Sequence, residues 1–229
     1  MKAVLRDWTD LAPGVRDFEF EVPAVDQLAY IPGQFVSFSA DIGGKRITRA
    51  YSVSSPPSGN RFRLCLNRVP DGHLSPMLFE AAPGAEIDMQ GPLGTFTIRD
   101  PARDMIMVAT GTGVAPFRAM IEHHLAMDGG GRITLLLGVR HEANLLYRAT
   151  FEALARDHAK FVFVPTVSRP GPDWAGRVGH VQPHLMEMVR DRRDLHIYAC
   201  GMKAMVDDVR TRLKEAGFDR RQIIVEKYD

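Results

Sequence analysis

Residues 108–117 read Val-Ala-Thr-Gly-Thr-Gly-Val-Ala-Pro-Phe, and this stretch decides the fold of the second half of the chain. Gly111 and Gly113 follow directly on an apolar run, where glycine lets the backbone turn sharply and approach a ligand closely. Pro116 suits the first turn of a helix, because its missing N–H needs no partner there. We predict a strand, a tight turn and a helix whose free N-terminal amides bind an anion such as pyrophosphate. A strand–helix turn without a ligand is the alternative, because Pro116 stands where the full dinucleotide fingerprint has its third glycine.

Strands and helices alternate on either side of this turn. Continuous apolar runs, typical of strands buried on both faces, predict strands at residues 105–109, 133–139, 161–164, 195–199 and 223–226. Helical spacing predicts helices at 114–127, 147–158, 180–189 and 202–216. This alternation predicts an α/β doubly wound parallel sheet, and we expect the domain boundary near residues 99–103.

The chain before residue 100 has a different rhythm. Short β-rich segments separated by turn residues predict strands at 15–22, 34–40, 49–54, 61–69, 86–90 and 95–98. The last two bracket a Gly-Pro-Leu-Gly turn at 91–94, and only residues 74–82 have a helical pattern. Many short strands at even spacing indicate an antiparallel barrel or sandwich.

A second candidate site lies in this first half. In Arg49-Ala50-Tyr51-Ser52, alternate residues of a strand point to one face, so Arg49 and Tyr51 bring a cation beside an aromatic ring. Such a pair suits a ligand with a phosphate and a flat ring, although an ordinary cross-strand packing pair fits the pattern equally. The loop at residues 70–75 opens the predicted helix and offers further amides and the hydroxyl of Ser75.

Composition limits the function classes. The 229 residues carry a formal net charge of +1, whereas a nucleic-acid-binding domain is usually strongly basic. Two cysteines, Cys65 and Cys200, are too few for an all-cysteine zinc or [2Fe–2S] site, and we expect no metal. No apolar run approaches the roughly 20 residues that cross a bilayer, and the N-terminus lacks the apolar core of a signal peptide. We therefore expect a cytoplasmic protein with no membrane insertion.

Four motifs stand in the order and approximate spacing of one known family. They are Arg49-Ala50-Tyr51-Ser52, Gly72-x-x-Ser75, Gly111-Thr112-Gly113-Val114-Ala115-Pro116 and Cys200-Gly201. In these motifs, and over nearly its whole length, the chain resembles the ferredoxin–NAD(P)H reductase superfamily. The resemblance implies an antiparallel six-stranded β-barrel that binds FAD, residues 1–100, followed by an NAD(P)-binding Rossmann-like domain, residues 101–229.

The resemblance also implies roles for residues of the first half. Arg49 binds the FAD pyrophosphate, Tyr51 packs on the isoalloxazine, and Ser52 hydrogen-bonds near flavin N5, where the hydride arrives. The rest of the FAD site consists of Cys65, Leu66 and Asn67 on a strand and of His73, Leu74 and Ser75 at the start of a helix.

In the second half, the resemblance implies that Gly111, Thr112 and Gly113 meet the nicotinamide nucleotide and that Cys200 and Gly201 lie beside the nicotinamide. Glu226 and Tyr228 match the terminal acid and aromatic residue that cover the flavin in some members, but here Asp229 follows. The role of Tyr228 therefore stays open. Ser52, Cys200 and Glu226 would position the hydride transfer, and none of them needs to act as a nucleophile.

The choice between NADH and NADPH stays open in the sequence. Ser168-Arg169 resembles a segment that contacts the nucleotide in NADP-linked members, but similar segments occur in NADH-linked ones. Arg140 would favour a 2′-phosphate, whereas Glu142 would favour a free 2′-hydroxyl. Residues 141–142 also fit a solvated loop.

Several further features favour structural roles. The adjacent His123 and His124 point about 100° apart on a helix and form a poor chelate. Met202, Met205, Val209 and Leu213 form a stripe of helical spacing, which indicates packing. The basic cluster at residues 190–193 fits a solvated turn better than a docking site for an acidic ferredoxin.

The expected function is that of an FAD-dependent NAD(P)H reductase that passes electrons to a separate ferredoxin or oxygenase-type protein. The expectation of a separate acceptor depends on the cysteine count and on a length that leaves no room for an appended [2Fe–2S] domain. Two alternatives stay open: an NAD(P)H:flavin reductase that uses diffusible flavin, and a non-catalytic nucleotide-binding redox-sensor subunit.

Overall fold

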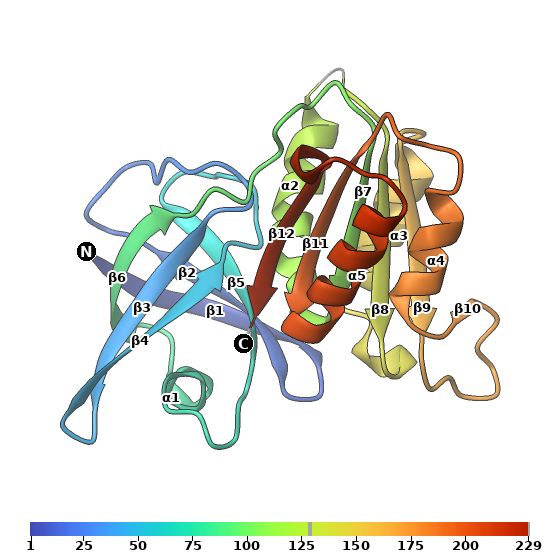
Figure 1. Cartoon of the computed structure of the whole chain (residues 1–229). Coiled ribbons are helices and arrows are strands. Elements are labelled where there is room, and N and C mark those ends of the chain that lie inside the picture. Colours follow the sequence, from blue (N-terminus) through green and yellow to red (C-terminus); the bar gives the residue numbers. More distant parts are fainter. Residues whose placement is uncertain (128–129, 229) are drawn as a thin grey trace. The chain divides into compact units, whose positions relative to one another are not determined.

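The computed structural model describes residues 1–127 and 130–228 (Figure 1). Two compact units make up the chain. The first comprises residues 1–98 together with 115–123, and the second comprises residues 99–114 together with the chain from His124 onward.

Six antiparallel strands form the sheet of the first unit. They are β1 (Lys2–Ala12), β2 (Val15–Glu21), β3 (Phe35–Ile42), β4 (Lys45–Ser52), β5 (Arg61–Asn67) and β6 (Glu86–Leu93), in the order β4-β3-β6-β1-β2-β5. The chain just beyond β4 returns to β5 through a bridge between Val53 and Leu64. The backbone N–H of Ser54 also donates to the carbonyl of Arg63 at 2.8 Å. This pairing joins the two outer strands and closes the sheet into a barrel. The short helix α1 (Leu74–Glu80) follows β5.

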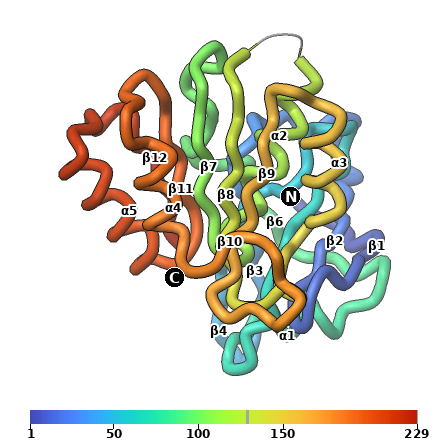
Figure 2. Tube along the Cα trace, turned by 90° about the vertical axis from the view of Figure 1, so that its right-hand side faces the viewer, coloured from blue at the N-terminus to red at the C-terminus, as the bar shows by residue number. Residues whose placement is uncertain are grey.

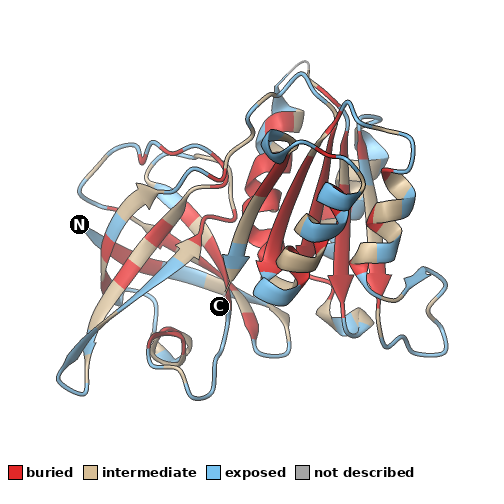
Figure 3. Ribbon diagram, in the orientation of Figure 1, coloured by how far each residue is buried: buried red, intermediate tan, exposed pale blue. Residues whose placement is uncertain are grey.

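Inward-facing aromatic side chains fill the barrel. Phe20 packs edge-on against Phe38, with ring centroids 4.9 Å apart, and stacks on Phe62 at 5.7 Å. All three side chains are buried, and buried residues largely alternate with half-buried ones along β2 and the first half of β3, as expected for strands with one face in a core (Figure 3).

The second unit is built on a fully parallel sheet. Its strands are β7 (Met105–Thr110), β8 (Ile133–Val139), β9 (Phe161–Val167), β10 (Arg177–Val178), β11 (His196–Met202) and β12 (Ile223–Tyr228), in the order β10-β9-β8-β7-β11-β12. The connecting helices are α2 (Ala115–Ala126), α3 (Arg148–Asp157), α4 (Val181–Met188) and α5 (Lys203–Glu215), with 3-10 turns η1 (Gly111–Val114), η2 (Glu142–Asn144) and η3 (Arg220–Gln222). Strand order reverses at β7, which lies between β8 and β11. In doubly wound sheets the carboxyl ends of such strands form the ligand site.

Helices cover both faces of this sheet, so its strands are apolar on both sides. Helices α4 and α5 lie on one face and α3 on the other (Figure 2). Val181 and Leu185 of α4 and Val209 of α5 share a buried core with residues of β7, β8 and β11. On the opposite face, Phe151 of α3 packs against Phe163 of β9 with ring centroids 5.3 Å apart. Among the helices of the described residues, none has the length and apolar character needed to span a membrane.

The predicted fold class, an antiparallel six-stranded barrel followed by a parallel doubly wound sheet, is confirmed. Three local predictions were wrong. Residues 95–98 are not a strand; Phe96 instead packs on Phe117 with ring centroids 5.7 Å apart. Strand β6 continues through the predicted Gly-Pro turn, because Leu93 still pairs with Phe35. Met202 ends β11 and is 66% exposed, so it does not belong to the buried stripe of α5. The sequence prediction also missed strands β1 and β10.

Candidate functional site

Strand β4 brings Arg49 and Tyr51 close together in the first unit. Tyr51 packs edge-on against Phe38 with ring centroids 5.9 Å apart. Burial raises the pKa of Tyr51 to about 12, and the charge of Arg49 acts in the opposite direction. The Arg49 guanidinium donates to the carbonyl of Thr48 at 2.8 Å, and within the described chain no carboxylate forms an ion pair with it. The pair therefore offers a ring and an unneutralised cation to a ligand that has a flat ring and a phosphate.

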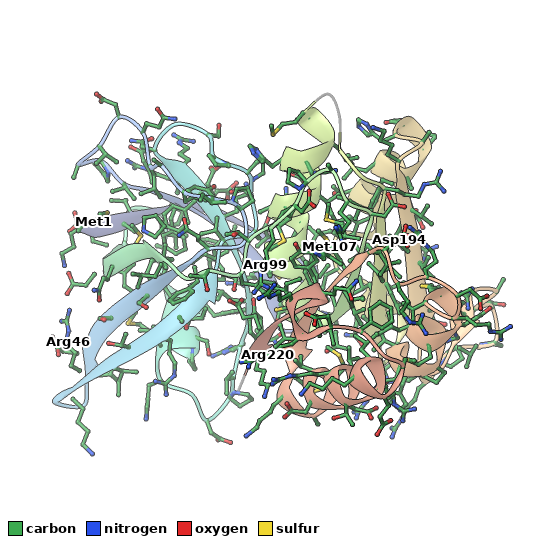
Figure 4. All side chains as sticks on the ribbon, turned by 45° about the horizontal axis from the view of Figure 1, so that its top comes forward. Met1, Arg46, Arg99, Met107, Asp194 and Arg220 are labelled. Atoms are coloured by element: carbon green, nitrogen blue, oxygen red, sulfur yellow. The ribbon has the colours of Figure 1, made fainter. Side chains whose placement is uncertain are left out.

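The contrast with Arg46 on the same strand is informative. Its guanidinium pairs with Asp88 at 2.7 Å and with Asp41 at 3.2 Å (Arg46 is labelled in Figure 4). Arg46 thus holds neighbouring strands together, whereas the charge of Arg49 stays available. Ala50, between Arg49 and Tyr51, is exposed, and Ser52 at the end of β4 is buried.

The remaining predicted FAD residues lie on β5 and at the start of α1. Cys65 and Leu66 are buried near the end of β5, and Asn67 is exposed. At α1, His73 is exposed at the N-cap position and forms no side-chain cap, and the first turn contains no acid. Leu74 and Ser75 are buried, and the Ser75 hydroxyl accepts from the backbone N–H of Val69 at 3.0 Å. The Ser75 hydroxyl is therefore already part of the loop that precedes the helix.

In the second unit, the glycine turn lies at the reversal point of the sheet. Gly111, Thr112 and Gly113 form the 3-10 turn η1 directly after β7, as predicted, and α2 begins two residues later with Pro116 in its first turn. A Cβ on Gly113 would overlap the carbonyl oxygen of Cys200, so only glycine fits where η1 crosses the end of β11. Gly201 has a φ of +141°, and a Cβ there would collide with the hydroxyl of Thr110.

Thr110 is a residue that the sequence prediction missed. Its Oγ1 atom is buried and has no hydrogen-bond partner among the described residues. An unpartnered buried hydroxyl between two glycine positions marks a place for a polar ligand group. The signal in the sequence was a hydroxyl residue at the end of an apolar strand, directly before Gly111. With the acid-free first turn of α2, this cradle fits a nicotinamide nucleotide.

Cys200, Glu226 and Tyr228 form a cluster at the same end of the sheet. Cys200 and Glu226 are register partners on β11 and β12, and Tyr228 pairs with Met202. Burial, followed by the charge of Glu226, raises the pKa of the Cys200 thiol well above its ordinary value. A hydrogen bond with Tyr228 acts in the opposite direction. The prediction about Asp229 lies outside the described residues.

The loops after β8 and β9 contain the predicted coenzyme-selecting residues. Ser168 is half-buried and its hydroxyl donates to the carbonyl of Val139 at 3.4 Å, whereas Arg169 and Arg140 are exposed. Glu142 accepts the backbone N–H of Gly171 at 2.7 Å, so its carboxylate serves the neighbouring loop.

Two other clusters have structural contacts. His124 is buried and its Nε2 lies 3.0 Å from the carbonyl of Gly131, while His123 is exposed. Arg192 pairs with Asp104 at 2.9 Å and with Asp194 at 3.2 Å (Asp194 is labelled in Figure 4). Arg193 donates to three backbone carbonyls and lies over the ring of Phe218. Both cysteines are buried, and neither forms a disulfide.

Family models match both halves of the chain. An oxidoreductase FAD-binding domain matches residues 2–98, and an oxidoreductase NAD-binding domain matches residues 107–211.

Individual relatives agree with these matches. The chain is 38% identical over 229 residues to a protein named ferredoxin–NADP reductase B of Sorangium cellulosum, covering 96% of this chain and 93% of that protein. It is 30% identical to the toluate 1,2-dioxygenase electron transfer component of Pseudomonas putida over 90% of this chain, but spans only 60% of that protein. The crystal structure of an Amycolatopsis cytochrome P450 reductase superposes with a TM-score of 0.89 at 28% identity, covering 99% of this chain and 69% of that one.

Proposed function

The chain is a member of the ferredoxin–NAD(P)H reductase superfamily, and from this premise we propose that it takes hydride from NAD(P)H onto FAD and delivers electrons to a separate protein acceptor. It is an FAD- and NAD(P)-binding oxidoreductase. FAD accepts two electrons together as hydride and can release them singly. The acceptor that we propose is a ferredoxin or an oxygenase component. Support comes from the electron-transfer functions that the names of its relatives state and from the presence of two cysteines, too few to ligate an all-cysteine cluster.

We assign residues 1–100 to FAD and residues 101–229 to the nicotinamide nucleotide. In the first part, Arg49 would hold the pyrophosphate, Tyr51 would pack on the flavin, and Ser52 would hydrogen-bond at its edge. The rest of the proposed FAD site consists of Ala50, Cys65, Leu66, Asn67, His73, Leu74 and Ser75. These assignments draw support from the unneutralised Arg49 beside the half-buried ring of Tyr51.

In the second part, Gly111, Thr112 and Gly113 would bind the nucleotide, with Ser168 and Arg169 on the neighbouring loops. Cys200, Gly201 and Glu226 would lie at the nicotinamide, and Tyr228 would keep the thiol of Cys200 in place. The observation that carries the proposal is the meeting of Gly113, Gly201 and the unpartnered hydroxyl of Thr110 at the point where strand order reverses. These groups bind, orient and exclude water, because hydride transfer needs alignment rather than a nucleophile.

The experiment starts from the purified protein. We expect it to be yellow with bound FAD, to oxidise NAD(P)H with ferricyanide, and to reduce cytochrome c faster when a ferredoxin is added. A colourless protein that stays free of flavin when FAD is supplied would refute the proposal. Rapid mixing with NADH or NADPH that leaves the flavin absorbance unchanged would favour the redox-sensor alternative instead.

One observation favours a second candidate, a flavin reductase that uses diffusible flavin. The Ser75 hydroxyl already accepts from Val69, and α1 has no side-chain cap, so this segment offers few committed contacts to a pyrophosphate. Gel filtration separates the two candidates: bound FAD co-elutes with a reductase that delivers electrons to a protein, whereas a flavin reductase elutes without it. We also propose a cytoplasmic location, since two buried cysteines that form no disulfide suit a reducing compartment.

A further inference from the structure

The loops after β8 and β9 run side by side beyond the ends of their strands. The backbone N–H of Ser168 donates to the carbonyl of Val139 at 2.9 Å, and that of Arg169 donates to the carbonyl of Arg140 at 2.8 Å. The parallel pairing of the two strands therefore continues into the loops that contain the proposed coenzyme residues.

Two side chains of the β8 loop extend this connection. His141 Nδ1 lies 2.9 Å from the carbonyl oxygen of Arg169, and because a carbonyl only accepts, Nδ1 is the donor. Glu142 Oε1 accepts the backbone N–H of Gly171 at 2.7 Å. Together they hold the segment Ser168–Gly171, which we call the β9 turn, from the β8 side.

The position of Gly171 makes its amide unusual. Pro170 and Pro172 flank it, and proline has no backbone N–H. Gly171 therefore has the single amide of this Pro-Gly-Pro stretch, and Glu142 is its acceptor. The pKa of Glu142 lies below its ordinary value because its carboxylate accepts from its own backbone N–H and from that of Gly171. The carboxylate stays charged at neutral pH, when the reductase would work.

The arginines of the two loops are placed differently. The side chains of Arg140 and Arg169 are exposed, and no carboxylate of residues 1–127 and 130–228 forms an ion pair with either. The Glu142 carboxylate is thus engaged by the backbone, while the guanidinium groups of Arg140 and Arg169 stay available.

We propose that Glu142 is a positioning residue of the coenzyme site: it fixes the β9 turn through Gly171, so that Ser168 and Arg169 are held ready for the nucleotide, and it does not bind the ribose itself. This inference rests on the proposed function, since it concerns the nucleotide part of that same site. It replaces the interpretation from the sequence, in which Glu142 accepts a hydrogen bond from a free 2′-hydroxyl of the coenzyme.

Three variants test the proposal. Glu142→Ala removes the acceptor, Glu142→Gln keeps an oxygen at Oε1 but removes the charge, and Glu215→Ala is a control that removes one exposed charge from the end of α5. Thermal unfolding of each variant confirms that it folds. If Glu142→Ala does not fold, Glu142→Asp, whose carboxylate is one methylene shorter, replaces it.

The first readout uses the protein without coenzyme. Hydrogen exchange of the Gly171 amide, followed by NMR or by mass spectrometry of the peptide 169–173, measures directly how well the hydrogen bond to Glu142 protects this amide. We expect exchange about tenfold faster in Glu142→Ala than in the unaltered protein, and unchanged within about threefold in Glu142→Gln and Glu215→Ala. Equal exchange in Glu142→Ala and the unaltered protein would overturn the proposal.

The second readout is steady-state kinetics with NADH and NADPH and ferricyanide as acceptor. For Glu142→Ala we expect KM for the coenzyme to rise about fivefold while kcat stays within about twofold, and Glu142→Gln restores KM. If Glu142→Gln raises KM as much as Glu142→Ala while Gly171 exchange stays slow, the charge acts on the coenzyme directly and the proposal fails. If the unaltered protein oxidises neither coenzyme, the proposed function fails, and the exchange data alone then decide whether Glu142 holds the turn.

Discussion

Cys200 and Glu226 are register partners on the neighbouring parallel strands β11 and β12. Cys200 is fully buried, and burial together with the nearby carboxylate raises the pKa of its thiol well above the ordinary value of 9.0. The thiol therefore stays neutral over the working pH range, and Cys200 contributes a compact, uncharged surface rather than a thiolate.

This pair predicts a specific dependence of stability on pH. In the unfolded chain the thiol loses its proton near pH 9, while in the folded protein Cys200 keeps it. Above that pH the unfolded state binds fewer protons, so the free energy of unfolding falls as the pH rises, by about 1 kcal/mol between pH 8 and pH 10. Urea unfolding of the unaltered protein and of Cys200→Ser at both pH values isolates this contribution. An equal fall in both proteins would contradict the assignment.

The glycine turn predicts that two neighbouring glycines respond differently to alanine. A Cβ at Gly113 meets the backbone of Cys200 and Gly201, whereas a Cβ at Gly111 has open space but a φ of +54°. Gly113→Ala should lower the free energy of unfolding by about 2–3 kcal/mol, since backbone cannot yield to an overpacked atom. Gly111→Ala should lower it by only about 1 kcal/mol, from the left-handed backbone. Equilibrium unfolding gives both values, and titration with NADP+ should show weaker binding for Gly113→Ala.

Strand β4 predicts that its two arginines differ in their effect on FAD binding. Arg49→Ala should weaken FAD binding by about tenfold or more, because it removes an available cation from the proposed pyrophosphate contact. The control is Arg46→Ala, which removes a guanidinium already engaged by Asp88 and should leave FAD affinity within about twofold. Quenching of FAD fluorescence on addition to the flavin-free protein measures both dissociation constants. Equal losses in the two variants would refute the role of Arg49.

We expect substitution of Asp17, in the first unit, to lower the free energy of unfolding substantially. Its carboxylate, 6% exposed, accepts from Arg63 at 2.7 Å and from the hydroxyl of Ser54 at 3.2 Å. Asp17→Ala removes this buried carboxylate, which also lies 3.4 Å from the Arg118 guanidinium, and should reduce the free energy of unfolding by about 2–3 kcal/mol because its hydrogen bonds with charged groups are lost. Asp10→Ala, which removes a 71% exposed carboxylate from its pair with Arg16, should cost less than about 1 kcal/mol. Urea denaturation compares the two, and similar losses would show that the Asp17 network contributes little.

The parallel sheet was the part of the fold most readily predicted. Strands that are buried on both faces have continuous apolar sequences. The predicted strand at residues 133–139 therefore coincides with β8. The barrel was harder because its strands alternate only partly. Strand β1 was missed since its charged residues, among them Lys2, Arg6 and Asp7, interrupt the apolar positions that pack inward. Residues 95–98 look β-rich, but Phe96 is held by an aromatic contact with Phe117 that is distant in sequence.

The candidate site, like the fold, has features that the sequence could predict and others that it could not. The position of Gly111–Gly113 after a strand could be predicted, because local sequence sets the turn. The unpartnered hydroxyl of Thr110 could not, since it depends on where β11 passes. The hydrogen bond from the Gly171 N–H to Glu142 could not be predicted either. The two residues lie 29 positions apart and meet only because β8 pairs with β9.

Strand β10 has only two residues, Arg177 and Val178, and it ends the parallel sheet at the β9 side. A long, flat edge strand presents a row of free amides and carbonyls on which other chains can assemble. Here the edge strand forms only two residue pairs with β9. The side chain of its first residue, Arg177, is charged and pairs with Glu187. Strand β10 itself therefore offers few free amides and carbonyls for edge-to-edge assembly with another chain.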